Sequence, residues 1–383
     1  MIILILLQSC REEISRPVLN AKESTALDVY LSDYVSEKYK WGYLNKMGQL
    51  VIKNQFDDCR DFSEGLAAVN INGLWGYINN MGEIVVEPRF RAVYQFHEGL
   101  GLVYTFDGQY LFLDKDGTRA IDTLPYDEVH SFNSGRARVG SSRSYGYIDK
   151  FGKLVIPMRF DKAKNFAKGY ATVSEAALKN VIDTTGRVVF KSATSKDKVY
   201  GIKDGMLRFK QNKLYGFYNI ETREVIKPQY KRATDFENET AAVFDGYKWG
   251  LVDKAGKVTL LPYTQIKEGG EGKWIYRTDI KYGYLKDDGT QLTMPNFDIA
   301  TRYSDGMAGV EVNGLWGYVD SLGSLAIAPK FPLVWDFKEG RARMINQDGF
   351  GFIDSQGEYL IPPYYLEVRD FNEGLARVQI FRQ

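Results

Sequence analysis

Short stretches in which apolar and charged residues alternate recur along this chain. In Arg136-Ala137-Arg138-Val139 and Arg341-Ala342-Arg343-Met344 the arginines fall on one side of an extended chain and the apolar residues on the other. A period of two residues is typical of a β-strand with one buried face. Continuous apolar runs of strand length, such as Ile84-Val85-Val86, lie between these stretches, and helical patterning is nearly absent after residue 41. The pattern therefore predicts an all-β chain.

One phrase recurs about every 34 residues: an aromatic residue, then Gly, then usually an aromatic and an aliphatic residue. Such a period is typical of repeat architectures, in which each unit buries its apolar face against its neighbours. We expect these aromatic-Gly pairs to be structural, with the ring packed between units. The pairs are Trp41-Gly42, Trp75-Gly76, Tyr145-Gly146, Tyr215-Gly216, Trp249-Gly250, Tyr282-Gly283, Trp316-Gly317 and Phe350-Gly351.

Turn signals stand at fixed offsets from this phrase. Asp/Asn-x-x-Gly, as in Asn79 to Gly82, is typical of a type I turn and is followed by a β-rich run. A short irregular segment and a Phe-x-x-Gly corner, as in Phe62 to Gly65, then precede an alternating strand. Asn72-Gly73 is a strong hairpin signal, and it places Val69 opposite Gly76. Each unit is therefore predicted to have three antiparallel strands, and a β-branched residue at position 76 should intrude on Val69.

These motifs together resemble the WG-containing repeat family, also called KWG repeats. The resemblance extends from about Trp41 to the end of the chain, and it implies an all-β repeat protein without implying an activity. The aromatic-Gly pair is missing at Tyr110-Leu111 and around Lys179-Asn180-Val181, and Gly269-Gly270-Glu271-Gly272 replaces one corner. Between Lys191 and Gly205 a polar run stands where a corner is due, so we expect the most irregular part of the array there.

About ten units fit between residue 41 and the C-terminus. The fold that we expect is a curved, solenoid-like array of about ten three-stranded units, covering residues 31–383. A closed, propeller-like ring is the alternative, because both arrangements have the same sequence period.

Charge and residue content exclude several classes of function. The chain has 50 basic and 49 acidic residues, and no basic stripe stands out, so we expect no nucleic-acid partner. Its two histidines, His97 and His130, fall at or beside corner positions that vary between units. No nucleophile, metal-ligand or cofactor motif is present. We therefore expect a protein that is not an enzyme and has no metal and no cofactor.

Acidic residues share one position of the corner: Glu64, Glu98, Glu339 and Glu373. A row of carboxylates could bind calcium. We favour the interpretation that they cap their turns and keep the strand ends hydrated, because Ser134, Lys168 and Asn238 interrupt the row.

The N-terminus resembles a bacterial lipoprotein signal. An apolar run ends in Leu7-Gln8-Ser9-Cys10, in which a small residue precedes a Cys that would carry the lipid. The run is too short to span a membrane. We expect a signal-peptide remnant at residues 1–9, lipid on Cys10 and a tether over residues 10–30. This predicts a lipid-anchored protein of the bacterial outer membrane, and the acidic pair Glu12-Glu13 favours exposure on the cell surface.

A non-enzymatic envelope protein that binds another protein is the function that we expect, as a scaffold or an accessory subunit of a membrane complex. Aromatic and arginine side chains are enriched at interface hot spots, so the candidate contact residues are Arg136, Arg138, Arg341 and Arg343. The alternative is a glycan-binding surface protein that uses the repeated aromatic rings. That alternative requires a row of exposed rings, whereas a scaffold requires buried ones.

Overall fold

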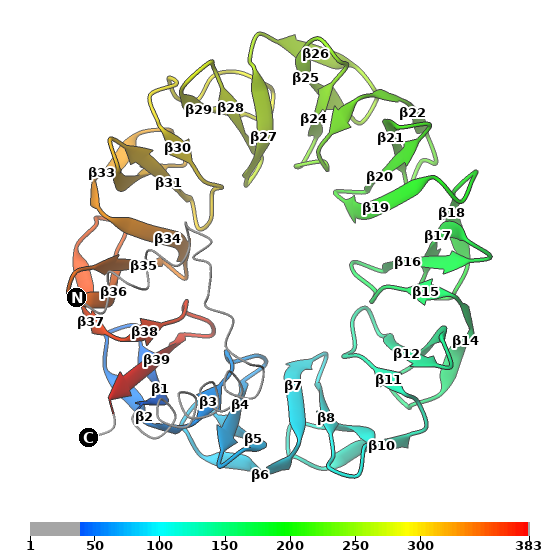
Figure 1. Cartoon of the computed structure of the whole chain (residues 1–383), viewed down its shortest axis with the longest axis vertical. Coiled ribbons are helices and arrows are strands. Elements are labelled where there is room, and N and C mark those ends of the chain that lie inside the picture. The colour runs from blue at the N-terminus through cyan, green and yellow to red at the C-terminus, as the bar shows by residue number, and fades with distance from the viewer. Residues whose placement is uncertain (1–38, 382–383) are drawn as a thin grey trace, which may run out of the picture.

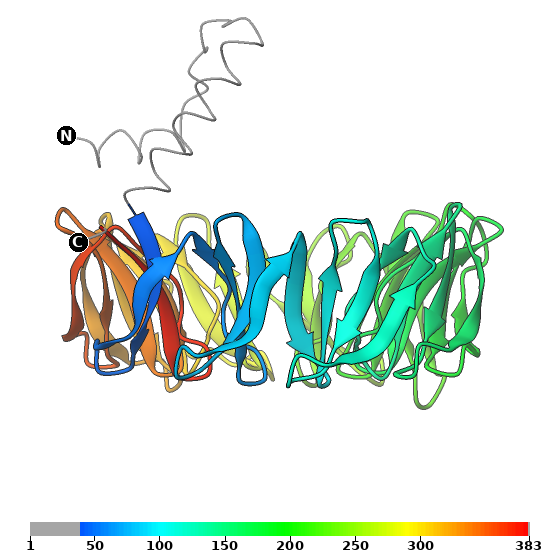
Figure 2. The ribbon, with the colours of Figure 1, turned by 90° about the horizontal axis from the view of Figure 1, so that it is seen from below.

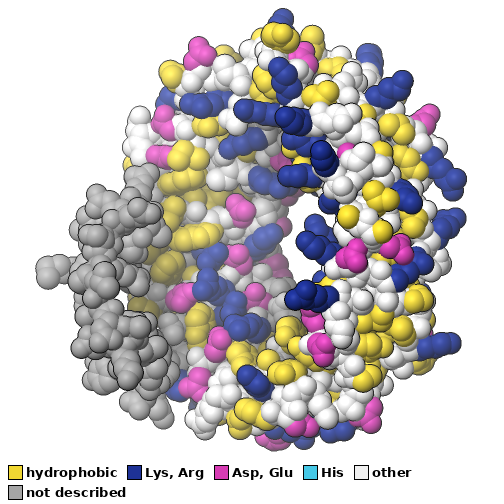
Figure 3. Space-filling model, turned by 45° about the vertical axis from the view of Figure 1, so that its right-hand side comes forward, with side chains coloured by type: hydrophobic (Ala, Val, Ile, Leu, Met, Phe, Trp, Pro, Cys, Tyr) yellow, Lys and Arg dark blue, Asp and Glu magenta, His cyan; other side chains and the backbone are white. Residues whose placement is uncertain are grey.

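The computed structural model describes residues 39–381, which form ten antiparallel sheets arranged in a closed ring (Figures 1 and 2). The ring has a central opening, which is still open in the space-filling view (Figure 3). This arrangement is a ten-bladed β-propeller. The all-β prediction and the predicted number of units are confirmed. The closed ring, given as the alternative, is the arrangement observed, and the open solenoid-like array is not confirmed. Cys10 and the proposed tether lie outside the described residues.

Each blade has four strands, except for one blade with three, so the prediction of three strands per unit was wrong. The missed strand lies next to the central opening, in the segment that the sequence showed as irregular (Figure 1). It is often only two residues long, as in Asp58–Cys59, which pairs with Asn70 and Val69. A two-residue strand leaves no period-2 pattern, because one inward and one outward residue do not make an alternation.

The strands follow the same order in each blade, from the opening outward. The innermost strands are β3 (Asp58–Cys59), β7 (Ala92–His97), β11 (Glu128–Val129), β15 (Lys162–Ala163), β19 (Lys198–Lys203), β23 (Arg232–Ala233), β27 (Gln265–Gly270), β30 (Ile299–Ala300), β34 (Leu333–Lys338) and β38 (Glu367–Val368). The second strands are β4 (Leu66–Ile71), β8 (Leu100–Tyr104), β12 (Ala137–Ser141), β16 (Tyr170–Glu175), β20 (Met206–Gln211), β24 (Thr240–Phe244), β28 (Lys273–Arg277), β31 (Met307–Val312), β35 (Arg341–Asn346) and β39 (Leu375–Phe381). The third strands, of which all but β9 and β17 carry the aromatic-Gly phrase, are β1 (Tyr39–Asn45), β5 (Leu74–Asn79), β9 (Tyr110–Leu113), β13 (Ser144–Ile148), β17 (Leu178–Asp183), β21 (Leu214–Asn219), β25 (Trp249–Asp253), β29 (Tyr282–Lys286), β32 (Leu315–Asp320) and β36 (Gly349–Ile353). The outermost strands are β2 (Leu50–Phe56), β6 (Ile84–Phe90), β10 (Arg119–Leu124), β14 (Leu154–Phe160), β18 (Val188–Lys191), β22 (Val225–Tyr230), β26 (Val258–Leu261), β33 (Leu325–Phe331) and β37 (Tyr359–Tyr365).

The two ends of the described chain meet in one blade, which closes the ring. We call this blade 1; it has the strand order β38-β39-β1-β2, and the others are numbered 2 to 10 along the chain from β3 to β37. Strands β1 and β39 pair in register from Tyr39↔Phe381 to Asn45↔Leu375. The sequence repeat is thus shifted by half a blade: each Trp-to-Trp unit supplies the outer half of one blade and the inner half of the next. Because of this shift, the first unit begins and the last unit ends with half a blade, and the two halves pair to form blade 1.

The glycine of the repeated phrase is required by a close approach of backbone. The predicted pairing Val69↔Gly76 is confirmed. A Cβ on Gly76, however, would lie 2.3 Å from the carbonyl oxygen of Val86 and 2.7 Å from the nitrogen of Pro88, so the crowding comes from strand β6 rather than from Val69. Strand β6 has a bulge there, since its register against β5 moves from Tyr77↔Val86 to Trp75↔Phe90. The recurrent proline lies in this bulge, where a missing N–H costs little.

At several junctions the second aromatic of the phrase joins one blade to the next. The Tyr77 hydroxyl donates a hydrogen bond to the carbonyl oxygen of Tyr94 in blade 3 (2.6 Å), and its ring packs edge-to-face on Phe96, the first residue of that blade's corner (4.9 Å between centroids). The same pair of contacts recurs at other junctions, for example from Tyr147 to the Lys164 carbonyl (2.6 Å) and Phe166 (4.7 Å). This contact explains why the aromatic-Gly phrase and the corner phenylalanine repeat together.

The polar stretch after β18 is an ordered connection. The buried Asp197 carboxylate accepts hydrogen bonds from the amides of Ala193 (3.0 Å) and Thr194 (2.9 Å). The corner that seemed to be missing is present as Ile202 to Gly205, and Asp204 has the positive φ of the other corners (50°). The expectation of a missing corner was wrong because an isoleucine stands in place of the phenylalanine.

Candidate functional site

The acidic corner residues join neighbouring blades. Both carboxylate oxygens of Glu64 accept hydrogen bonds from the next corner, from the amides of Glu98 (2.6 Å) and Gly99 (2.8 Å). Corresponding bonds to the next blade are made by Glu98, Ser134, Asp204, Glu271, Asp305, Glu339 and Glu373. The prediction that these side chains cap their own turns is corrected: they cap the following blade. Within residues 39–381, no group of three or more Asp, Glu, His or Cys side chains is arranged to hold a metal ion.

A lysine from the following blade completes several of these junctions. Lys115 lies 3.4 Å from Glu64, and Lys46 lies 2.9 Å from Glu339. Burial raises the pKa of Glu64, but the two amide hydrogen bonds and Lys115 outweigh it and hold that pKa below its ordinary value of 4.5. A depressed folded-state pKa means that this junction stabilises the fold above the ordinary pKa of Glu, and that the contribution disappears as the pH falls through the folded-state pKa.

We expect Glu64→Gln to lower the free energy of unfolding by about 1 kcal/mol at pH 7, because the charge-assisted bonds are replaced by neutral ones. The difference between variant and parent should shrink as the pH falls below about 4.5. Urea denaturation at pH 7 and pH 3.5 measures both values. A difference that is the same at the two pH values would contradict an ionised Glu64 at the junction.

The four arginines predicted to contact a partner have different surroundings. Arg343 donates to the Asp370 carboxylate (2.5 Å) and to the Val368 carbonyl (3.3 Å) of the next blade, and its side chain is only 12% exposed. Arg138 likewise bridges to blade 5 and contacts Glu128 (2.5 Å), with 16% of its side chain exposed. Arg136 donates to the Thr184 carbonyl of blade 5 (2.8 Å), and Arg341 lies at its corner near the Gly340 carbonyl (3.5 Å). That these residues contact a partner stays a prediction.

The two histidines lie in different surroundings. His97 ends strand β7 and is exposed. His130 lies 2.6 Å from Glu128 and also contacts Arg138, so it belongs to the link between blades 4 and 5. Cys59 is a buried free thiol, and burial raises its pKa to about 12, so it stays protonated at neutral pH.

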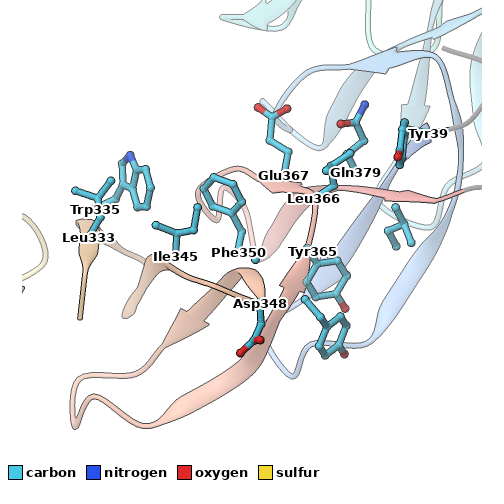
Figure 4. Close-up of a pocket in the computed structure, with 13 residues that line it drawn as sticks. Tyr39, Leu333, Trp335, Ile345, Asp348, Phe350, Tyr365, Leu366, Glu367 and Gln379 are labelled. Atoms are coloured by element: carbon cyan, nitrogen blue, oxygen red, sulfur yellow. The ribbon is translucent and has the colours of Figure 1, made fainter. Parts of the chain in front are cut away.

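A large apolar pocket lies where the ring closes, between blade 10 and blade 1 (Figure 4). Its volume is about 650 Å³, within the range of about 300–1,000 Å³ that is typical of ligand sites. We call it the seam pocket. It is lined by Tyr39, Leu333, Trp335, Ile345, Asp348, Gly349, Phe350, Tyr364, Tyr365, Leu366, Glu367, Gln379 and Ile380.

Aromatic rings shape the walls of the seam pocket. Trp335 packs beside Phe350 (5.7 Å between centroids) and has the Arg343 guanidinium over its ring at 4.9 Å, which fixes its orientation. Tyr364 and Tyr365, whose ring centroids lie 4.7 Å apart, also line the pocket, and Tyr365 pairs with Phe350 in the sheet. Gly349 has a φ of 136°, and a Cβ there would lie 2.8 Å from the Tyr365 carbonyl oxygen, so only glycine lets this wall come so close.

Polar and exposed groups at the rim make the seam pocket accessible. Tyr364 is 63% exposed and Leu366 is 50% exposed. The Glu367 and Asp348 carboxylates lie on two sides of the pocket (Figure 4). Glu367 pairs with Arg369, whereas Asp348 forms hydrogen bonds with Asn346 in its hairpin. The pocket thus combines an apolar interior with one carboxylate that has no cationic partner among residues 39–381.

Sequence reasoning missed the seam pocket. Trp335 and the pair Tyr364-Tyr365 stand outside the repeated phrase, and this could have drawn attention to them. Their contact with Tyr39 and Ile380 in one pocket depends on ring closure, which the sequence did not decide.

Within residues 39–381 there is no helix that is long and apolar enough to cross a bilayer.

Comparison with solved structures found several similar chains. A eukaryotic initiation factor structure is 9% identical, covers 90% of this chain and 98% of its own, and has a TM-score of 0.48. BamB from Moraxella catarrhalis is 10% identical, covers 83% of this chain and 95% of its own, and has a TM-score of 0.33. The computationally designed Ika8 protein is 13% identical, covers 71% and 95%, and has a TM-score of 0.35. No curated protein sequence matches the chain.

The WG containing repeat model matches seven segments that together make up more than half of the chain: residues 41–75, 75–110, 145–175, 215–249, 282–316, 316–348 and 350–380. These segments begin at the aromatic residue of the repeated phrase or at its position, and they run through the corner into the next blade. The unmatched stretches include the degenerate phrase around Lys179 and the replaced corner around Gly269. The chain therefore belongs to the WG-containing repeat family.

Proposed function

We propose that this chain is a non-enzymatic, lipid-anchored envelope protein whose propeller binds another protein through the seam pocket. The observation that carries the proposal is the apolar pocket of about 650 Å³ with Trp335, Phe350 and Tyr364 in its walls. Tryptophan and tyrosine are enriched at the centres of protein interfaces, where they receive an anchor side chain of the partner. Asp348 at the rim would favour a basic residue next to that anchor.

The burial of the repeated aromatics supports a protein ligand over a neutral glycan. The eight aromatic residues of the repeated phrase are buried or half-buried, and Trp41 and Trp249 are less than 9% exposed. They pack between blades, so they do not form the row of exposed rings that the glycan alternative requires. A mixed surface with buried tryptophans is what the scaffold hypothesis requires.

The position of the seam pocket supports a partner in or on the same membrane. Tyr39, where the described chain enters blade 1, is one of the pocket's lining residues. A lipid on Cys10 would therefore tether the ring through the strand that borders the pocket. We propose the bacterial outer membrane as the location, on the basis of Ser9-Cys10 and the apolar run before it.

Replacing Cys10, the proposed site of lipid attachment, tests the anchor separately from the pocket. Cys10→Ser should move the protein from the detergent phase to the aqueous phase in a phase-partitioning experiment, because a thioether-linked lipid can no longer form. A variant that partitions like the parent would contradict lipid attachment at this residue, and it would leave the seam-pocket proposal standing.

Site-specific crosslinking in the native host tests the pocket. A photoreactive phenylalanine analogue at Tyr364 should crosslink one defined protein. The same analogue at Tyr359 is the matched control, because Tyr359 is 52% exposed on the same strand, β37, and does not line the pocket. Equal labelling from the two positions, or no protein product from Tyr364, would contradict the proposal.

A further inference from the structure

A groove rich in lysine crosses blades 4, 5 and 6, on the side of the ring opposite the seam (Figure 1). It consists of two adjacent pockets with volumes of about 580 and 790 Å³. Nine basic side chains and two aspartates line them. We call this the basic groove; its basic residues are Arg138, Arg143, Lys162, Lys164, Lys179, Lys196, Lys198, Lys210 and Lys213.

Strand pairing makes the two pockets one continuous surface. Lys162 and Lys179 both pair with Ser174, which places them on either side of strand β16. The Lys179 ammonium donates to the Ser195 carbonyl in the connection to blade 6 (2.7 Å). From there Lys198 pairs with Lys210. Charges that are far apart in the sequence are thereby collected on one side of a chain whose net charge is only +1.

The positive charge of the basic groove is largely uncompensated. Among the ion pairs of residues 39–381, none involves Arg143, Lys162, Lys164, Lys196, Lys198 or Lys213. Of the two aspartates, Asp197 is 4% exposed and its carboxylate is occupied by the amides of its own turn. Asp161 is exposed and accepts a hydrogen bond from the Ala177 amide (3.5 Å), so it is one carboxylate among nine basic side chains. Like charges placed together without partners repel each other, so an anionic ligand would stabilise this surface.

The lining residues favour one class of anion. Lysine is depleted in protein interfaces, so an acidic protein surface is the less suitable occupant. Recognition of single-stranded nucleic acid uses aromatic stacking platforms. Among the described residues that line the groove, the one aromatic ring is Tyr145, which is half-buried with Arg138 over it at 5.2 Å. A membrane surface is flat, so its lipid headgroups would not enter two recessed pockets. Hydroxyl and amide side chains accompany the lysines and suit the hydroxyls of a sugar: Thr172, Ser174, Thr194, Ser195 and Asn212.

We propose that the basic groove binds a linear acidic polysaccharide, with lysines on its carboxylates and the hydroxyl and amide groups on its sugar hydroxyls. The site is independent of the seam pocket and of the proposed protein partner. It bridges blades 5 and 6, where Lys168 stands in the acidic corner position and the carboxylate link is missing. A bound chain would add a connection between these two blades.

Binding of oligogalacturonate to the purified full chain, measured by calorimetry at several salt concentrations, tests the proposal. We expect binding that weakens with rising salt, raises the melting temperature and is not seen with dextran, a neutral glycan. Two triple variants, Lys196→Gln/Lys198→Gln/Lys213→Gln and Arg143→Gln/Lys162→Gln/Lys164→Gln, should each weaken binding by about tenfold or more. The matched control Lys53→Gln/Lys227→Gln/Lys257→Gln removes the same charge from exposed positions outside the groove and should bind like the parent.

Three outcomes would overturn the proposal. The first is that oligogalacturonate does not bind the parent. The second is that polyglutamate, single-stranded DNA or anionic vesicles bind more tightly than oligogalacturonate. The third is that the control variant loses as much affinity as the groove variants. Because the two triple variants are independent, misfolding of one of them leaves the other to decide.

Discussion

Gly76→Val is expected to lower the free energy of unfolding by about 3 kcal/mol or more. The added Cβ would lie 2.3 Å from the Val86 carbonyl oxygen and 2.9 Å from the Pro88 Cα. Both are backbone atoms of a bulged strand and cannot rotate away as a side chain can. Denaturant unfolding of parent and variant measures the difference.

Gly201→Val is the matched control, because Gly201 also lies in a strand, β19, and a Cβ there would meet no atom within 4 Å. It should stay within about 0.5 kcal/mol of the parent. Equal losses from the two substitutions would mean that the effect comes from strand propensity. In that case the close approach of strand β6 would not be the reason why position 76 requires glycine.

Removing strand β39 is expected to abolish the single cooperative unfolding transition. A chain that ends at Gly374 loses all seven pairs between β1 and β39 and the contribution of Ala376 and Val378 to the core between blades 10 and 1. It leaves an open edge on both sides of the gap. The expected loss is comparable with the whole stability of a domain, about 5–15 kcal/mol. Calorimetry should show broad or multiple transitions.

A circular permutant is the matched control, because it keeps every strand. A short turn would join Phe381 to its partner Tyr39, and the new ends would lie in the hairpin between Asn72 and Gly73. This chain should melt in one transition near that of the parent. If the truncated chain melts like the permutant, ring closure does not hold the structure together.

Much of the fold could be predicted from local signals. The pairing of Val69 with Gly76 followed from one Asn-Gly turn, because a two-residue hairpin fixes the register of both strands. The innermost strand could not be predicted, because Asp58–Cys59 is too short to show a period. Closure could not be predicted either, since the pairing of Tyr39 with Phe381 joins opposite ends of the described chain and leaves no local pattern.

Candidate sites were less predictable than the fold. The roles of Glu64 and Arg343 lie in contacts with the next blade, so a pattern within one unit gives only their position. The basic groove collects lysines from Lys162 to Lys213, and a chain-wide charge balance averages them away. The seam pocket exists only in the closed ring. These sites are formed by neighbouring units, and a single repeat does not contain the information.

The affinity of the crosslinked partner for two leucine variants tests the central claim, that the seam pocket is the binding site. Leu366 is 50% exposed and lines the pocket, whereas Leu260 is 57% exposed on β26 of blade 7 and does not. Leu366→Asp should weaken binding by at least about tenfold, because it places a charge in an apolar site, and Leu260→Asp should bind like the parent. Both variants should melt like the parent. An unchanged affinity of Leu366→Asp, or an equal loss in the two variants, would contradict the claim.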